Sequence, residues 1–215
     1  MAITGLFLFG FVVVHMLGNL QIFLGQEALN AYAEHLEELP LLLWPARIFL
    51  LVTLIIHMVT AISLAIENKN ARPVGYSFQN TVQASYASRT MVMSGVIIFL
   101  FIVYHLLHFT FDVTNPELAH LVDSKGRDDV YSMVVLSFQN IFISSTYITA
   151  MAILCFHLSH GLSSLFQSLG LNDMKYDGLV KKIGRGIALA IFIGNSSMPV
   201  AAFFHLINVP KGVAG

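Results

Sequence analysis

The sequence predicts an all-α membrane protein, a bundle of five transmembrane helices. Hydrophobic residues make up 56% of the 215 residues and charged residues 11%, whereas soluble domains carry about 25% charged residues. Five apolar stretches reach the roughly 20 residues that a helix needs to cross a bilayer. No soluble domain fits between them, so residues 1–215 are expected to form one transmembrane domain. The predicted spans are residues 3–24, 45–66, 90–111, 140–166 and 186–206.

The first stretch is predicted to be a retained helix and not a signal peptide. It lacks a basic leader, it is longer than the apolar core of a signal peptide, and no small-residue cleavage motif precedes Gln26. Five spans place the two ends of the chain on opposite sides of the membrane.

The connections predict further helical segments at one surface. The run EALNAYAEHLEEL has apolar residues at helical spacing, which predicts a short helix lying on the membrane surface. Residues 129–138 are predicted as a helical lead into the fourth span. Pro73 and Gly75 mark a loop over residues 70–79, and residues 170–173 are predicted as a turn. No internal repeat is apparent.

Charge asymmetry predicts the orientation. The connections 67–89 and 167–185 carry seven lysine and arginine residues, whereas the opposite side carries four. Acidic residues have the reverse bias, three against nine. Because positively charged loops stay in the cytoplasm, we expect a cytoplasmic N-terminus and a multi-pass protein of a bacterial inner membrane.

Six of the nine histidines lie within predicted spans, where ionisable side chains are unfavourable and usually mark a function. These six are His15, His57, His105, His108, His157 and His160. The remaining three, His35, His120 and His205, lie in outer connections or at the end of the last span, and we interpret them as ordinary interfacial residues.

One deep histidine from each of the first four spans falls at one of two depths. His15 lies roughly 18 Å from the inner end of the first span, and His105 roughly 22 Å from that of the third. His57 and His157 each precede the inner end of their span by nine residues, or about 14 Å. The first and third spans therefore supply an outer pair, and the second and fourth supply an inner pair.

Two such pairs suit two haems in the core of the bundle, one bound by His57 and His157 and the other by His15 and His105. Two axial imidazoles leave no open position on the iron, which suits electron transfer. The alternative is that these imidazoles hydrogen-bond between helices. Cys155 is the only cysteine, which excludes an intrachain disulfide, a thiolate zinc site and an iron–sulfur cluster.

Small residues one turn from three of these histidines are expected to provide room for the porphyrins. They are Gly18 after His15, Ala61 after His57 and Gly161 after His157, whereas Phe109 occupies the matching position after His105.

His160 and His108 lie three residues beyond His157 and His105, toward the nearer membrane surface. Each is a candidate for a contact to a haem propionate or a quinone, and an interfacial role is the alternative. His160 and His157 can also exchange roles, because three residues change the depth by only about 4.5 Å. The matching depth of His57 favours His157 as the ligand.

Several short motifs carry a family resemblance. HLSHGLSSLFQSLG in the fourth span stands beside HMLGNL in the first, IIHMV in the second, and ASRTM and YHLLHF around the third. Together they resemble the di-haem cytochrome b membrane anchor of succinate:quinone oxidoreductases, the succinate dehydrogenase and fumarate reductase family. The resemblance covers all five spans. It implies the same pairing, with His15 and His105 at the distal haem and His57 and His157 at the proximal haem.

The resemblance also implies partners. The family's anchors dock a cytoplasmic iron–sulfur subunit, itself bound to a flavoprotein subunit where succinate and fumarate interconvert, and they exchange electrons with a membrane quinone, often menaquinone. The chain would then be a non-flavin subunit that does not oxidise succinate alone. Basic residues that could face the iron–sulfur subunit, or serve only as topology signals, are Arg72, Arg89, Lys181, Lys182 and Arg185.

The quinone site is expected near the outer haem. Single-haem anchors of the same superfamily carry an HxxxGxRHxxxDxG-like run, and here Ser163, Ser164 and Ser168 replace its Arg, His and Asp, which argues against their inner quinone site. Di-haem members place the quinone near the outer haem. The outer segment offers polar candidates for binding quinone or relaying protons, and solvated surface charges are the alternative reading. The candidates are Glu27, Asn30 and Glu34, with His35 and Trp44 nearby.

Two other functions are compatible with the sequence. Cytochrome b anchors of hydrogenases and other quinone-linked dehydrogenases also pair histidines within helices. A transporter that moves protons or metal ions along intramembrane histidines is a third hypothesis, although the spans contain no acidic residue and no matched pair of broken helices. Membrane lipid is an expected partner and nucleic acid is not.

Overall fold

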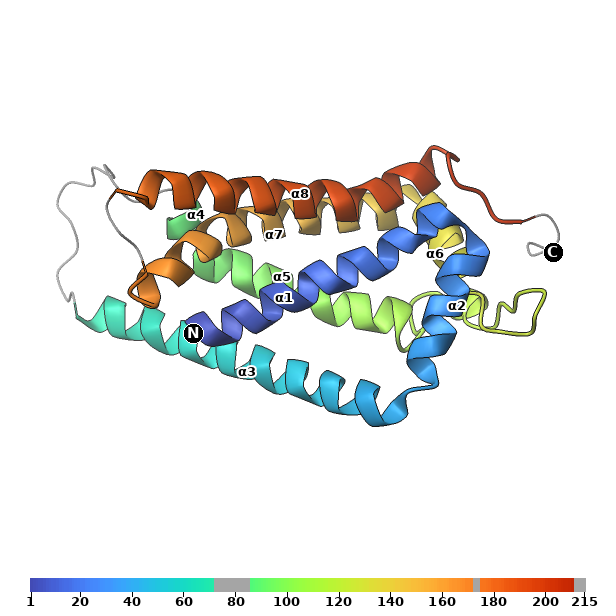
Figure 1. Cartoon of the computed structure of the whole chain (residues 1–215), viewed down its shortest axis with the longest axis horizontal. Coiled ribbons are helices and arrows are strands. Elements are labelled where there is room, and N and C mark those ends of the chain that lie inside the picture. The colour runs from blue at the N-terminus through green and yellow to red at the C-terminus, as the bar shows by residue number, and fades with distance from the viewer. Residues whose placement is uncertain (72–85, 172–174, 211–215) are drawn as a thin grey trace.

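The computed structural model describes residues 1–71, 86–171 and 175–210. Within these ranges the chain is helical, with one isolated β-bridge between Val122 and Asp128. Figure 1 shows the arrangement. The α-helices are α1 (Ala2–Asn19), α2 (Gln26–Glu37), α3 (Pro40–Asn70), α4 (Tyr86–Arg89), α5 (Met91–Phe109), α6 (Val130–Gln139), α7 (Ile141–Ser168) and α8 (Asp177–Phe203), and the 3-10 helices are η1 (Leu20–Leu24) and η2 (Pro116–Leu118).

In the described part of the chain, five helices are long and apolar enough to cross a membrane, which confirms the predicted fold class. They are α1 continued by η1, α3, α5, α7 and α8. All five run along the long axis in Figure 1, and α2 and α6 lie at one end. We call this end the α2–α6 end. The opposite end, toward which the N-terminus lies, is the N-terminal end.

Two long helices extend well past their predicted spans. α3 begins at Pro40 instead of residue 45 and continues to Asn70, and α8 begins at Asp177, nine residues before the predicted start at 186. Hydropathy reports only the part of a helix that suits lipid, so polar turns at its ends are missed. In α8 such a turn contains an ion pair one turn apart, Lys181 with Asp177 at 2.6 Å.

The short helices follow the predicted pattern. The surface helix forms as α2, and the predicted lead into the fourth span forms as α6. Asp129 caps α6 by accepting a hydrogen bond from the Ser132 amide. Asn140 has an extended backbone and caps α7 through the amides of Phe142 and Ile143, which separates the two helices. Most of the predicted loop over 70–79 lies outside the described residues.

The outward faces of the long helices are apolar. Leu41 is 93% exposed, Ile3 and Val14 are each 63% exposed, and Thr53 is the only buried residue of α3. Apolar exposure on this scale is incompatible with water and is typical of surfaces that lipid covers. The fold is therefore that of a multi-pass membrane protein.

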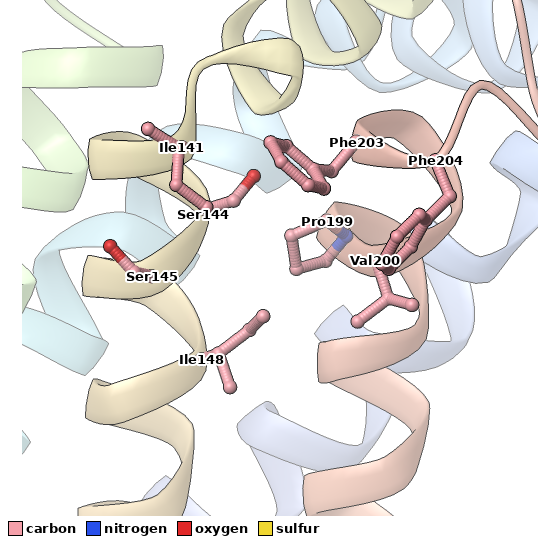
Figure 2. Close-up of a pocket in the computed structure, with 8 residues that line it drawn as sticks. All are labelled: Ile141, Ser144, Ser145, Ile148, Pro199, Val200, Phe203 and Phe204. Atoms are coloured by element: carbon pink, nitrogen blue, oxygen red, sulfur yellow. The ribbon is translucent and has the colours of Figure 1, made fainter.

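A small apolar pocket of about 190 Å³ lies between α7 and α8 at the α2–α6 end. Figure 2 shows Ile141 and Ile148 of α7 facing Pro199 and Phe203 of α8. The hydroxyls of its two serines bond to backbone carbonyls of α6 and α7. No histidine lines this pocket, so it belongs to the helix packing and not to the histidine pairs.

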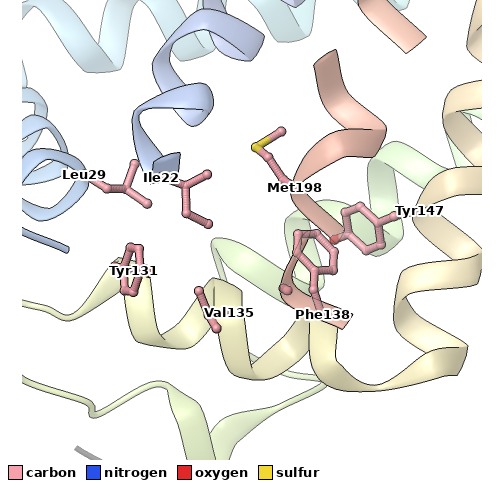
Figure 3. Packing of buried hydrophobic residues seen from close by; sticks show 8 residues of the cluster. Ile22, Leu29, Tyr131, Val135, Phe138, Tyr147 and Met198 are labelled. Atoms are coloured by element: carbon pink, nitrogen blue, oxygen red, sulfur yellow. The ribbon is translucent and has the colours of Figure 1, made fainter. Parts of the chain in front are cut away.

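A cluster of buried apolar residues lies at the α2–α6 end. It joins the end of the first span to α2, α6, α7 and α8 (Figure 3). The N-terminal end lacks a comparable cluster among the described residues. The cluster therefore fixes the α2–α6 end of the bundle. Its members are Ile22, Leu29, Tyr131, Val135, Phe138, Tyr147, Met198 and Ala202.

Candidate functional site

The structure brings the four deep histidines together in two pairs. The ring centroids of His15 on α1 and His105 on α5 lie 5.8 Å apart, with the ring planes at 85°. His57 on α3 and His157 on α7 lie at a second, common level, because they contact Thr4 of α1 and Ser94 of α5, which precede His15 and His105 by the same number of residues. The sequence predicts the same two levels, and the role of these histidines as haem ligands stays a prediction.

The two pairs lie at different levels of the bundle. His57 contacts Thr4 of α1, and His157 contacts Ser94 of α5. Thr4 precedes His15, and Ser94 precedes His105, by eleven residues each, which is about 16 Å along a helix. Eleven residues are also close to three full turns. Near the N-terminal end, α1 and α5 therefore each contact one member of the His57–His157 pair. Three turns further along the same face, they supply His15 and His105.

A hydroxyl from a neighbouring helix holds His57. Thr4 Oγ1 lies 3.1 Å from His57 Nδ1 and 2.8 Å from the carbonyl oxygen of Met1. The carbonyl can only accept, so the single hydroxyl proton of Thr4 points to Met1. Both contacts are hydrogen bonds only if His57 Nδ1 carries a proton and donates it to Thr4. The neutral ring then has its lone pair on Nε2.

His157 has the same arrangement on the other side of the bundle. Ser94 Oγ lies 3.0 Å from His157 Nδ1 and donates its proton to the carbonyl oxygen of Met91, also at 3.0 Å. His157 Nδ1 must therefore carry a proton, and Nε2 keeps its lone pair. A histidine whose Nδ1–H is fixed by a hydrogen bond and whose Nε2 is available is the usual form of a metal ligand.

A glycine lies beside each of these rings. A side chain at Gly5 would come within 3.3 Å of His57 Cε1, and one at Gly95 within 3.6 Å of His157 Cε1. Gly5 directly follows Thr4 and Gly95 directly follows Ser94. Each of the pairs Thr4–Gly5 and Ser94–Gly95 thus combines a hydroxyl that accepts a hydrogen bond with a glycine whose backbone lies close to the histidine ring. We call them the two hydroxyl–glycine pairs.

The other pair has aromatic neighbours. Phe11 stacks on His15 at 5.2 Å and Phe101 stacks on His105 at 6.0 Å, each from one turn earlier on the same helix. His15 Nε2 lies 3.1 Å from the side-chain amide of Asn19. Ligation through this nitrogen requires that amide to turn aside, so the pair at this level is less open than the other.

A tyrosine hydroxyl joins His105 to His108. Tyr147 Oη lies 3.3 Å from His105 Nδ1 and 2.9 Å from His108 Nδ1, and His108 Nε2 lies 3.3 Å from Ser137 Oγ. The hydroxyl carries one proton, so it donates to one ring and accepts from the other. If it donates to His108, His105 keeps a lone pair on Nε2.

His108 and His160 differ in their surroundings. His108 is buried, with 2% of its surface exposed, and it stacks on Phe109 at 3.9 Å. Both its nitrogens contact protein hydroxyls, so this geometry does not support the predicted contact to a propionate or quinone, which stays a prediction. His160 is half-buried on α7, three residues after His157. His35, His120 and His205 are exposed, as expected for interfacial residues.

Two similar twelve-residue segments contain Thr4 and Ser94, which are not among the site residues predicted from the sequence. Residues 4–15 and 94–105 share a hydroxyl residue, a glycine, a phenylalanine and a histidine at equal spacing. Each helix is followed by a short helix and another long one, α2 and α3 in the first half and α6 and α7 in the second. A search for Thr or Ser followed directly by Gly, with His eleven positions after the hydroxyl residue, would have identified Thr4 and Ser94.

The expected spacers have different roles in the structure. A side chain at Gly18 would come within 2.6 Å of the Tyr32 hydroxyl, so Gly18 makes room for α2 and not for a cofactor beside His15. A side chain at Gly161 would meet no heavy atom within 4 Å. Gly161 therefore still fits the predicted role of leaving space near His157, and Ala61 is half-buried on α3.

The polar candidates on α2 are bound to a loop that precedes α6. Asn30 is fully buried, donates to Asp123 at 3.3 Å and Asp129 at 3.0 Å, and accepts from the Tyr131 amide at 2.9 Å. Gln26 donates to Asp129 at 2.7 Å. We call this set of contacts between α2 and residues 123–131 the α2 clip. In this geometry Asn30 holds the clip together, and its predicted quinone role stays a prediction.

Ion pairs surround the buried part of the α2 clip. Arg127 contacts Asp123 at 2.6 Å and Glu27 at 2.8 Å, and Lys125 contacts Glu27 at 2.5 Å. Burial alone would raise the pKa of Asp123, but hydrogen bonds from Arg127, the Lys125 amide and Asn30 lower it well below its ordinary value. Hydrogen bonds from Lys125 and Arg127 also lower the pKa of Glu27.

Glu34 lies at the edge of the same charged group. It is 3.6 Å from Arg127 and lines a polar pocket of about 300 Å³ with Glu37 and Lys125. No histidine lines this pocket, so in this structure it is separate from the histidine pairs. The placement gives Glu34 an ion-pair role, and its predicted role at a quinone stays a prediction.

The chemistry available at the site is two-imidazole ligation. No group of three or more histidine, cysteine or carboxylate side chains that could hold a metal ion occurs in residues 1–71, 86–171 and 175–210. Cys155 is a free cysteine on α7. A bound metal centre would therefore need to supply its other ligands itself, as a porphyrin does.

Comparisons with known proteins add no assignment: no family model matches this chain, and neither curated proteins nor solved structures gave a match.

Proposed function

We propose that this protein is the di-haem cytochrome b membrane anchor of a succinate:quinone oxidoreductase, transferring electrons between an iron–sulfur subunit and a membrane quinone. The supporting observation is that four helices place four histidines at two levels, His15 with His105 and His57 with His157, about 16 Å apart along α1 and α5. Each pair is of the kind that bis-imidazole haem ligation requires.

The residues fit the group. The rings of His15 and His105 lie with their centroids 5.8 Å apart, so these two residues would hold one haem between α1 and α5. His57 and His157 have Nδ1 engaged by hydroxyls, which leaves Nε2 for the iron. Asn19 beside His15 has to turn aside. A b haem held in this way supplies reversible one-electron transfer.

The protein's own residues orient the haems and exclude other chemistry. Two imidazoles per iron leave no site for oxygen, so the pairs suit electron transfer and not oxygen activation. The surrounding helices present apolar side chains, which keep water away from the buried level. Two levels stacked along the bundle provide a route from one membrane face to the other.

The partners follow from the family resemblance. The iron–sulfur subunit and its flavoprotein are proposed to dock at the N-terminal end, which would face the cytoplasm of a bacterium because of its basic connections. Electrons would then reach a quinone, proposed to be menaquinone, toward the α2–α6 end. The chain itself is not proposed to bind flavin or succinate.

The ligand assignment is tested by haem content. The chain is purified in mild detergent, and a dithionite-reduced minus oxidised spectrum is recorded with haem quantified per chain for native protein, His57→Ala, His105→Ala and His35→Ala. We expect two b haems in the native protein and in His35→Ala, whose ring is exposed. Each of the other variants should lose one haem. A colourless native protein, or full haem in both variants, would contradict the proposal and favour a histidine-dependent transporter.

A separate experiment identifies the complex. The protein is purified from its host under conditions that keep subunits together, and the co-purifying proteins are assayed for covalent flavin and for succinate-dependent quinone reduction. A flavoprotein with succinate activity supports the proposed complex. A haem-bearing anchor that co-purifies with a hydrogenase or another dehydrogenase would overturn the choice of complex and leave the haem assignment intact.

A further inference from the structure

We propose that the two hydroxyl–glycine pairs, Thr4–Gly5 on α1 and Ser94–Gly95 on α5, are equivalent positioning elements that set the midpoint potential of the haem at His57 and His157. The inference rests on the proposed function. It assigns a role to four residues that are not ligands.

The hydrogen bonds at His57 and His157 run in the same direction, from the ring to the hydroxyl. Thr4 and Ser94 both direct their hydroxyl proton to a carbonyl three residues earlier on their own helix, at 2.8 and 3.0 Å. Each oxygen can then only accept from the histidine, at 3.1 and 3.0 Å. The backbone thus fixes the hydroxyl, and the hydroxyl fixes which nitrogen of the imidazole carries the proton.

Both histidines at this level have the same two kinds of contact, a hydroxyl and a glycine. His57 and His157 come from different helices, yet each meets a hydroxyl at Nδ1 and a glycine at Cε1. A hydrogen bond to a positioned acceptor orients the ring and increases the electron donation of a metal-ligating histidine. Because stronger donation favours the oxidised iron, the two hydroxyls together lower the midpoint potential of this haem.

His15 and His105, at the other level, lack the contact to a hydroxyl that donates its proton to a helix carbonyl. His15 meets the Asn19 amide at Nε2, and His105 Nδ1 shares the Tyr147 hydroxyl with His108. Neither ring meets a hydroxyl whose proton is committed to a helix carbonyl. Removing Thr4 or Ser94 hydroxyls should therefore change one haem and leave the other unchanged.

The experiment is a potentiometric titration of the purified native protein, Thr4→Val, Ser94→Ala and the double variant. Thr4→Ser and Ser94→Thr keep the hydroxyl. Matched controls are Thr60→Val and Ser159→Ala. These hydroxyls lie within three residues of His57 and His157, and among the described residues they bond only to backbone carbonyls of their own helices. His57→Ala, titrated in parallel, identifies which of the two redox transitions belongs to this level.

We expect Thr4→Val and Ser94→Ala each to raise the midpoint potential of the haem that His57→Ala removes. A tenfold loss of preference for the oxidised state corresponds to a rise of about 59 mV for one electron. The double variant should show the largest rise, and the hydroxyl-keeping variants and both controls should match native protein. The second haem should keep its potential in all of them.

The outcomes separate the inference from the function on which it rests. If His57→Ala loses no haem, the proposed function fails. If His57→Ala loses one haem but the Thr4 and Ser94 variants keep native potentials, the positioning role is overturned and the haem assignment stands. Equal shifts in the Thr60→Val and Ser159→Ala controls would also overturn it. If Thr4→Val fails to fold, Ser94→Ala alone carries the comparison, and the reverse holds if Ser94→Ala fails, because each hydroxyl acts on a different ring.

Discussion

The Tyr147 hydroxyl of α7 lies 2.9 Å from His108 Nδ1 on α5, and both side chains are buried. The same hydroxyl is 3.3 Å from His105, so one oxygen serves a predicted haem ligand and a structural histidine. Four aromatic rings, those of Phe101, Tyr104, Phe109 and Phe138, lie edge-on to the Tyr147 ring. Tyr147 therefore couples the packing of α5, α6 and α7 to the histidine pair at the α2–α6 end.

Tyr147→Phe should destabilise the protein and disturb one haem. Removal of the hydroxyl leaves a buried nitrogen of His108 without its partner, an effect of about 1–3 kcal/mol. We expect a lower thermal unfolding midpoint in detergent and an altered spectrum of the haem that His105→Ala removes. Tyr104→Phe is the matched control, since Tyr104 packs on the same ring. Equal effects of Tyr147→Phe and Tyr104→Phe would show that the Tyr147 hydroxyl contributes nothing specific to stability or to the haem spectrum.

Asn30→Ala should open the α2 clip. The substitution removes two donors from buried Asp123 and Asp129 and one acceptor from the Tyr131 amide. Leaving buried polar groups unpaired lowers the free energy of unfolding by about 1–3 kcal/mol. The measurement is the thermal unfolding midpoint, with His35→Ala on the exposed face of α2 as the control. A stable Asn30→Ala protein with impaired quinone reduction would instead favour the quinone role predicted from sequence.

The α2 clip should weaken in acid. The pKa of Asp123 is lowered in the folded protein, chiefly by hydrogen bonds from Arg127 that outweigh its burial, and that of Glu27 is lowered by Lys125 and Arg127. A carboxyl whose folded pKa is depressed stabilises the fold above its unfolded pKa, about 4, and loses that stabilisation as the pH falls toward the folded pKa. The pH dependence between 6 and 3 should be shallower in Asp123→Asn, measured by the unfolding midpoint. Identical slopes would contradict the assignment.

The number of membrane-spanning helices follows from the sequence, because span length and hydropathy act locally. The depth of His15, His57, His105 and His157 also follows, since a helix rises by a constant amount per residue. The sequence does not show that Thr4 and Ser94 turn toward histidines on other helices. That contact depends on how each helix is rotated about its axis, which tertiary packing decides.

Gly18 shows why a residue type alone is a poor guide to its role. A glycine one turn from His15 suits a porphyrin neighbour, yet in the fold its missing side chain admits Tyr32 from α2. The candidates Glu27 and Asn30 were found because they are polar and near the expected surface. Their partners in residues 123–129 are about 100 positions away, so sequence spacing could not show that they form a clip.

Gly18→Ala should destabilise the protein, whereas Gly161→Ala should not. An added methyl group at Gly18 would lie 2.6 Å from the Tyr32 hydroxyl and 2.9 Å from its ring, so the Tyr32 contact must shift. Overpacking of this kind lowers the free energy of unfolding by about 1–3 kcal/mol. At Gly161 nothing lies within 4 Å, and alanine in a helix gains about 0.5–1 kcal/mol over glycine.

The pair of glycine variants also tests where a haem sits. Unfolding midpoints and haem content are measured for Gly18→Ala, Gly161→Ala and the double variant Gly18→Ala with Tyr32→Ala, which removes the clashing ring. We expect the double variant to recover part of the lost stability with full haem content. If Gly161 leaves space for the haem at His57 and His157, Gly161→Ala should keep its fold but shift the spectrum of that haem. An unchanged spectrum would mean that the space beside Gly161 faces lipid, because a methyl group that contacts no haem cannot change the haem's spectrum.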